Sequence, residues 1–182
     1  MPLAPGVEVV PLRSPTLAPF THTNLLVVRA ADEAAPLLLV DPAAGEAVRD
    51  AFAALVRAEL HAATPARRAA GVRVFLSHHH YDHWCGLAAA AAVCAELGVP
   101  LAVCAHERTV QRVRSDARLP ALHGDVVYRA CAHGEHVAGG FAALDAQYAF
   151  QPGDSIFTEI SRKFTPNSLD ADRPPAGLVR TA

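Results

Sequence analysis

Six consecutive positions, 78 to 83, hold four histidines and one aspartate. The segment 72–76 before them is short, mostly apolar and rich in β-branched residues, so it predicts a strand that ends where the histidines begin. Alternation along an extended backbone sends His78, His80 and Asp82 to one side. Imidazole nitrogens and carboxylate oxygens bind zinc, manganese and ferrous iron. We therefore expect His78 and His80 to bind one ion, while the turn into a helix directs Asp82 and His83 towards a second.

A plainer interpretation exists for each of these residues. A surface histidine cluster can be merely polar, Asp82 can be the N-cap of the following helix, and Trp84 can be a core side chain. Packing alone, however, gives no reason to concentrate so many ionisable side chains at one strand end. We therefore favour metal binding, with Asp82 able to serve both as a ligand and as a cap.

Short apolar runs and helical periodicity place this loop within an alternating pattern. Strands are predicted at 7–12, 24–30, 37–40, 72–76, 101–104 and 126–129. Helices are predicted at 45–60, 84–97 and around 107–114. Further on, the glycine pair at 139 and 140 predicts a hairpin turn before a weak strand at 141–150. Alternating strands and helices predict an α/β fold, in which ligand sites lie at the carboxyl ends of strands.

The length and composition fit one globular domain with a buried core. The chain has 182 residues, of which 52% are hydrophobic, and its formal net charge is -2. Acidic and basic residues are interspersed, so no basic stripe could follow a phosphate backbone, and nucleic acid is not an expected partner. The alanine-rich residues 87–93 are too few to span a membrane, so no membrane association is expected.

The cysteines and the N-terminal segment bear on the compartment. Cys85, Cys94, Cys104 and Cys131 form neither a Cys-x-x-Cys pair nor the dense framework of small secreted domains. The N-terminal segment has no long apolar run and no basic stretch of the kind that opens a secretory signal. We expect a soluble protein of the cytoplasm or an organelle, without a secretory signal.

The run from Ser77 to His83, followed by Gly86, resembles the T/S-H-x-H-x-D-H-x-x-G signature of the metallo-β-lactamase superfamily. Upstream, THTNLL at 21–26 and LLLVDP at 37–42 are especially similar to the plant-type hydrolases of the glyoxalase II-like branch. Downstream, AHERT at 105–109 is similar to a segment of the same branch. The resemblance covers about residues 7–114 and extends weakly to 141.

This resemblance implies a fold and a domain organisation. The family fold is a four-layer αββα sandwich of two similar halves, of which this chain covers the first half well and the second poorly. We expect a metallo-β-lactamase-like domain at 1–163, with only its first half complete, and a loop-like or disordered tail at 164–182.

The resemblance also implies an activity. The protein would be a metal-dependent hydrolase that uses a metal-bound hydroxide on an ester, thioester, lactam or phosphoester of a small-molecule substrate. Its cofactor would be one or two zinc ions, with iron or manganese as alternatives. His78 and His80 would bind the first metal, Asp82 and His83 the second, and Asp82 would act as the catalytic residue that orients the hydroxide.

The sequence departs from the family pattern in its second half. A family member would next supply a third histidine for the first metal, a bridging aspartate and a final histidine, yet no histidine follows His136. The nearest substitutes are HGEH at 133–136 and PGDSIF at 152–157. His22 and His106 are not ligands in the family pattern and are expected to be structural or solvent-facing. Two alternatives stay open: a catalytically silent metal-binding protein without a complete site, and a single-iron enzyme of the persulfide dioxygenase type.

Overall fold

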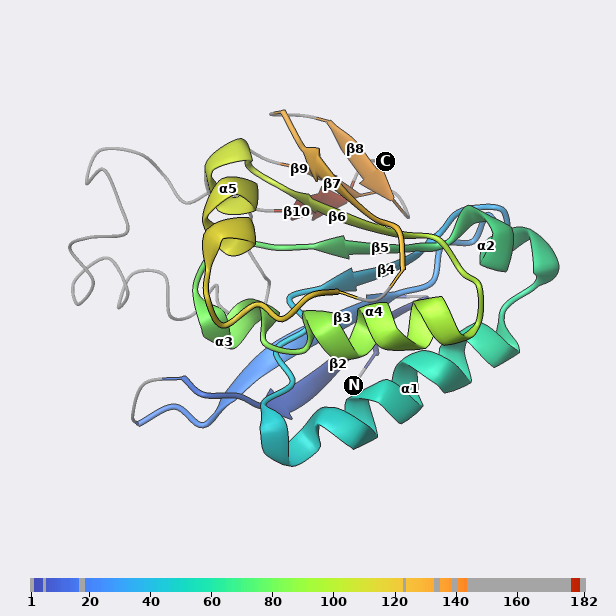
Figure 1. The fold of residues 1–182 in the computed structure, drawn as a ribbon. Helices are drawn as coiled ribbons and strands as arrows, with labels where there is room; N and C mark the ends of the chain where they lie inside the picture. Colours follow the sequence, from blue (N-terminus) through green and yellow to red (C-terminus); the bar gives the residue numbers. More distant parts are fainter. Residues whose placement is uncertain are drawn as a thin grey trace.

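Seven strands form one mixed sheet in the computed structural model, which describes residues 2–4, 6–16, 19–122, 124–132, 135–138, 141–143 and 178–180. The strands lie side by side in chain order: β1 (Pro2–Ala4), β2 (Val7–Arg13), β3 (His22–Val28), β4 (Leu37–Val40), β5 (Val72–Phe75), β6 (Leu101–Ala105) and β7 (Val126–Ala130). Neighbours from β1 to β4 pair antiparallel, and neighbours from β4 to β7 pair parallel. Parallel neighbours need crossover connections, which helices supply here (Figure 1).

The helices lie in the connections between the parallel strands. They are the 3-10 helix η1 (Glu46–Val48), α1 (Arg49–Ala62), α2 (Pro65–Ala70), α3 (Tyr81–Trp84), α4 (Leu87–Glu96) and α5 (Glu107–Ser115). In α1, the buried side chains Phe52, Val56 and Leu60 recur every four residues and therefore share one face. This face packs against the sheet and fixes the position of the helix.

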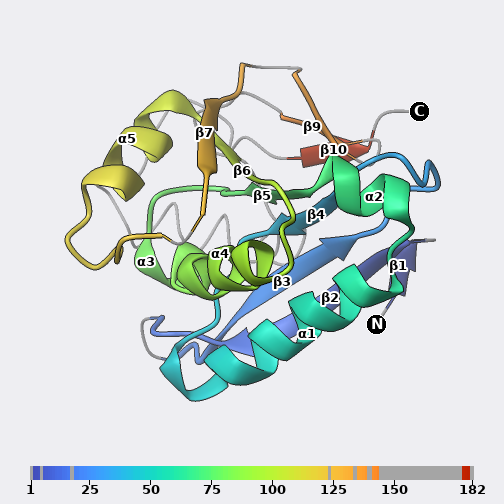
Figure 2. The same ribbon diagram turned by 45° about the vertical axis from the view of Figure 1, so that its right-hand side comes forward.

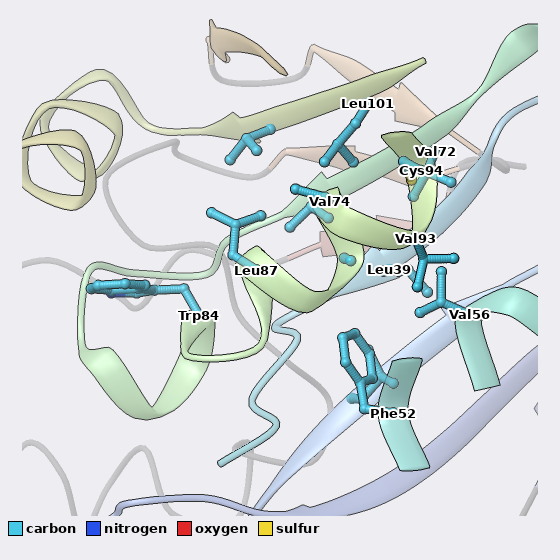
Figure 3. Close-up of a cluster of buried hydrophobic side chains, with 14 of the residues drawn as sticks. Leu39, Phe52, Val56, Val72, Val74, Trp84, Leu87, Val93, Cys94 and Leu101 are labelled. Carbon is cyan, nitrogen blue, oxygen red and sulfur yellow. The ribbon is translucent and has the colours of Figure 1, made fainter. Parts of the chain in front are cut away.

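One face of the seven-stranded sheet is covered by α1, α4 and α5, and the main core lies between them. Leu39 of β4 and Val74 of β5 meet Phe52 of α1 and Leu87 of α4 in one cluster of buried side chains (Figure 3). Trp84, at the end of α3, belongs to the same cluster. The core therefore extends from the helices to the segment that follows the histidine loop.

A smaller sheet covers the opposite face. Its strands are β8 (His136–Ala138), β9 (Phe141–Ala143) and β10 (Leu178–Arg180), paired antiparallel in the order β10-β9-β8. Val137 and Ala138 of β8 pack in a second buried cluster with Leu38 and Phe75 of the large sheet. The described part of the chain is thus layered as helices, a seven-stranded sheet and a smaller sheet (Figure 2).

The strand predictions up to residue 130 are confirmed within a few residues, but two helix predictions need correction at their starts. The helix predicted at 45–60 opens with η1, so α1 itself begins at Arg49. The helix predicted at 84–97 is interrupted at Gly86, whose N–H binds the carbonyl oxygen of Pro42 at 2.7 Å. A Cβ at Gly86 would stand 2.6 Å from that oxygen, so only glycine permits this approach, and α4 starts at the next residue.

The second half of the chain is described only in part. The weak strand predicted at 141–150 is described at β9, whereas the glycine pair at 139 and 140 lies outside the described residues. Of the segment 164–182, for which a loop-like tail is predicted, the structure describes Leu178–Arg180, which form β10. Backbone pairing with β9 creates this strand, and a three-residue strand carries too little periodicity to be seen in the sequence. Within the described ranges, no helix is long and apolar enough to cross a bilayer.

A cavity made beneath α1 should destabilise the whole domain. Leu39 is fully buried in the central strand β4. The substitution Leu39→Ala removes atoms from the packed core and leaves a cavity that the neighbouring side chains fill only in part. We expect the free energy of unfolding in urea to fall by about 2–5 kcal/mol. Val127→Ala is the matched control, because Val127 is 60% exposed, and its change should stay within about 1 kcal/mol. Equal losses in both variants would contradict this assignment of the core.

Candidate metal centre

The histidine loop begins directly after β5, at the carboxyl end of the parallel part of the sheet. The chain continues β5 through Leu76, whose N–H binds the carbonyl of Cys104 at 2.9 Å, and then turns through Ser77 into the loop. The short helix α3 completes this loop at the end of the sheet where β4 and β5 also finish (Figure 1). This is the position predicted for a ligand site in an α/β fold.

Asp41, which follows β4, holds the loop in place. Its side chain is completely buried, and its Oδ1 accepts the N–H of Ser77 at 2.7 Å. Its Oδ2 lies 2.5 Å from Ser77 Oγ and 2.8 Å from His83 Nδ1. Asp41 adopts φ 52°, a left-handed conformation that is uncommon outside glycine and asparagine or aspartate. The strained backbone thus turns a buried carboxylate towards three donors of the loop.

The contact with Asp41 also determines which nitrogen of His83 is available. A carboxylate only accepts hydrogen bonds, so Nδ1 of His83 donates to Asp41, and in the neutral imidazole the lone pair is then on Nε2. Metal-binding histidines are oriented in the same way by a carboxylate on their other nitrogen. His83 Nε2 lies 3.8 Å from Asp82 Oδ2, so these two predicted ligands of the second ion are neighbours.

The two predicted ligands of the first ion lie closer together than those of the second. Nε2 of His78 is 3.1 Å from Nδ1 of His80, and the ring of His78 stands 3.9 Å from that of His83 between centroids. Ser77 Oγ, which donates to Asp41, lies 2.9 Å from His78 Nδ1 and accepts a hydrogen bond from it. The same carboxylate therefore orients His83 directly and His78 through a hydroxyl group.

These imidazoles are held in the neutral form. Burial is the main reason that the pKa of His78 lies well below its ordinary value, and the neighbouring rings of His83, His80 and His79 lower it further. The pKa of His80 is also lowered, mainly by burial, although the carboxylate of Asp82 acts in the opposite direction. Only a neutral imidazole can donate a lone pair to a metal ion, so this environment favours ligation near neutral pH.

His79 is contacted from the side of α5, although its ring centroid lies only 4.9 Å from that of His80. Arg112 of α5 donates to Nε2 of His79 at 2.8 Å, and burial is the main cause that lowers the pKa of His79 to about 4. The carbonyl of His79 accepts the indole N–H of Trp84 at 2.9 Å. The guanidinium of Arg118 lies over the ring of Tyr81 at 4.5 Å from its centroid. Contacts from the α5 region therefore support the outer side of the loop.

The donor atoms are of the types that bind metal ions, but they do not form a complete coordination sphere. Two nitrogen ligands 2.0–2.1 Å from a tetrahedral zinc stand roughly 3.3 Å apart, which is close to the separation of His78 Nε2 and His80 Nδ1. In the described part of the chain, however, no three histidine, cysteine, aspartate or glutamate side chains are grouped so that they could hold one ion. The residues present thus supply pairs of donors rather than a finished coordination sphere.

The other candidate residues have different surroundings. The side chain of His106 accepts a hydrogen bond from the N–H of Arg108 at the start of α5. His22 is an exposed residue of β3, and its Nδ1 lies 2.7 Å from Thr21 Oγ1. Both surroundings agree with the structural or solvent-facing roles predicted for these histidines. His136 is exposed on β8, whereas 133, 134 and the PGDSIF segment at 152–157 lie outside the described residues.

Asp41 and Ser77 were missed as functional residues. The only signal for Asp41 was an acidic residue closing an entirely apolar strand.

Comparison with known proteins adds a structural match. No protein family and no curated protein matches the sequence. The crystal structure of a β-lactamase domain protein from Burkholderia ambifaria superimposes with a TM-score of 0.53 over 74% of this chain, at 18% identity. The chain spans 44% of the length of that structure. The fold is therefore metallo-β-lactamase-like, and the described elements correspond to about half of that architecture, as the sequence resemblance predicts.

Removal of the negative charge from Asp41 should change the proton position on His83. In Asp41→Asn the amide NH₂ can donate to Nδ1 of His83, which then moves its proton to Nε2. We expect this tautomer switch in long-range ¹H–¹⁵N spectra, together with a loss of about 1–3 kcal/mol in the free energy of unfolding. Asp125→Asn, at an exposed position, is the control and should change neither quantity. An unaltered His83 tautomer in Asp41→Asn would contradict the orienting role of Asp41.

Proposed function

We propose that this chain is a metal-dependent hydrolase domain that acts on an ester, thioester, lactam or phosphoester of a small molecule. The observation that carries the proposal is the buried carboxylate of Asp41, which orients the loop so that His78, His80, Asp82 and His83 gather at one strand end. A loop needed only for folding would have no reason to bring the ring nitrogens of His78 and His80 within 3.1 Å of each other.

Each side chain has a distinct role in this proposal. His78 and His80 bind the first ion, and Asp82 and His83 bind the second, with zinc preferred by the nitrogen and oxygen donors and iron or manganese as alternatives. When bound, such an ion supplies an activated water at neutral pH and polarises the bond under attack. Asp82, partly exposed beside His83, accepts a hydrogen bond from the attacking water and so orients it.

The incomplete donor set predicts weak metal binding. Zinc sites normally use at least three protein ligands, and the family pattern would take a third histidine and a bridging aspartate from the second half of the domain. Asp154, in the PGDSIF segment, is the residue that the resemblance suggests for the bridge. No histidine of this sequence is available there, so the first ion would depend on His78, His80 and non-histidine ligands.

A catalytically silent metal-binding protein is the second candidate function. It is favoured by one observation, namely that the described residues contain no group of three side chains able to hold one ion. A single-iron enzyme of the persulfide dioxygenase type would use the same first-metal histidines. The three candidates differ in how much metal the protein retains, which metal it is, and whether an ester is hydrolysed.

The decisive test is His80→Ala, because the loss of this side chain removes one of the two closest nitrogen donors. In a metal-dependent hydrolase, zinc affinity should fall at least about tenfold, and turnover of activated ester and thioester substrates should fall with it. Elemental analysis and competition with a chromophoric chelator measure the first quantity. His61→Ala, at an exposed position of α1, is the matched control and should leave both quantities unchanged.

Each other outcome identifies a different candidate. Activity that survives a strong chelator would contradict the proposal. Metal well below one ion per chain, with no turnover on an ester panel, would identify the silent protein. Iron as the sole retained metal, with no ester hydrolysis, would identify the dioxygenase type.

A further inference from the structure

A pocket of about 300 Å³ opens beside α3, on the side where β2 ends and α1 begins. These three segments lie at the same end of the molecule (Figure 1). The lining includes charged, aromatic and small apolar side chains, among them Arg13, Pro15, Glu46, Arg49, Tyr81 and Cys85. Because Tyr81 and Cys85 belong to the same turn as Asp82 and His83, the pocket adjoins the candidate metal centre.

The walls of this pocket are fixed by backbone contacts. The N–H of Gly45 binds the carbonyl of Arg13 at 3.0 Å, and a Cβ on Gly45 would approach that oxygen to 2.9 Å. Ser14, the next residue, is buried and its Oγ lies 2.8 Å from Thr23 Oγ1. The end of β2 is therefore held against the segment before α1, so the pocket exists without a ligand to form it.

Two arginine residues line the pocket without a carboxylate partner in the described ranges. Neither Arg13 nor Arg49 forms an ion pair there, although Glu46 lines the same pocket. Arg49 also stands in the first turn of α1, where the helix dipole disfavours a positive charge. Its charge therefore does not stabilise the start of the helix.

The thiol of Cys85, which lines the pocket, does not act as a nucleophile there. Burial, together with the nearby carboxylate of Asp82, raises the pKa of Cys85 to about 12. The residue is thus a neutral thiol near pH 7 and contributes an apolar wall instead of a nucleophile or a metal ligand. Pro15, Ala44 and Ala47 add further small apolar surfaces.

We propose that this pocket binds the anionic end of the substrate, a carboxylate or phosphate on a short apolar stem, through Arg13 and Arg49. Guanidinium groups recognise both anions by charge-assisted hydrogen bonds. The other end of the substrate then lies next to Asp82 and His83 across the turn of α3. This link to catalysis rests on the proposed hydrolase function, whereas the binding of the anion does not.

Binding is tested on the full chain in the presence of a strong chelator, so that its outcome is independent of any metal. Inorganic phosphate and butyrate are titrated separately by isothermal calorimetry and by ¹H–¹⁵N chemical-shift mapping. We expect saturable millimolar binding of at least one of them, with shifts at residues 13–15 and 44–49. Arg13→Gln/Arg49→Gln should weaken it by at least about tenfold, since two charge-assisted contacts are lost.

The matched control is Arg57→Gln, which removes the same charge from a half-buried position of α1 outside the pocket, where Arg57 pairs with Glu96. It should bind the anion as tightly as the wild type. Both pocket arginines are exposed and without a described ion-pair partner, so the double variant should fold, which circular dichroism and the two single variants check. Phosphate binding alone would indicate a phosphorylated substrate, and butyrate binding alone a carboxylate. Absence of saturable binding for both anions, or equal weakening in Arg57→Gln, would overturn the proposal.

Discussion

The buried carboxylate of Asp41 is the interaction on which the arrangement of the site depends. One side chain receives a backbone N–H and a hydroxyl from Ser77 and the Nδ1 of His83. A buried charge without such donors would be strongly unfavourable, so the carboxylate and the loop stabilise each other. Loss of either partner would leave unsatisfied polar groups in the core.

This interaction is itself a consequence of the sheet. β4 and β5 are parallel neighbours with Val40 opposite Phe75, so the residues that follow both strands emerge side by side. The N–H of Asp41 binds the carbonyl of Phe75 at 3.0 Å, which extends the pairing by one step beyond the strands. The helices on one face and β8 on the other bury these strand ends, and burial in turn keeps the imidazoles neutral.

The sequence predicted the parts of the structure that depend on local periodicity. Continuous apolar runs located β4 and β5, the spacing of Phe52, Val56 and Leu60 located α1, and the histidine cluster located the loop. The role of Asp41 could not be predicted in this way, because its partner Ser77 lies 36 residues further on and only strand pairing brings the two together. The break at Gly86 depends in the same way on Pro42, a contact between distant segments.

The hydrogen bonds of the loop also separate its folding from metal binding. In small zinc domains the ion supplies the folding energy, because the ligands have no other partners. Here, His83 and His78 are already bound to Asp41 and Ser77, and Trp84 anchors the end of the loop in the core. The loop therefore has protein partners of its own, and a weakly bound ion would add correspondingly little to the stability of the fold. It follows that metal affinity and turnover, rather than thermal stability, are the properties that distinguish an active hydrolase from a silent protein with the same loop.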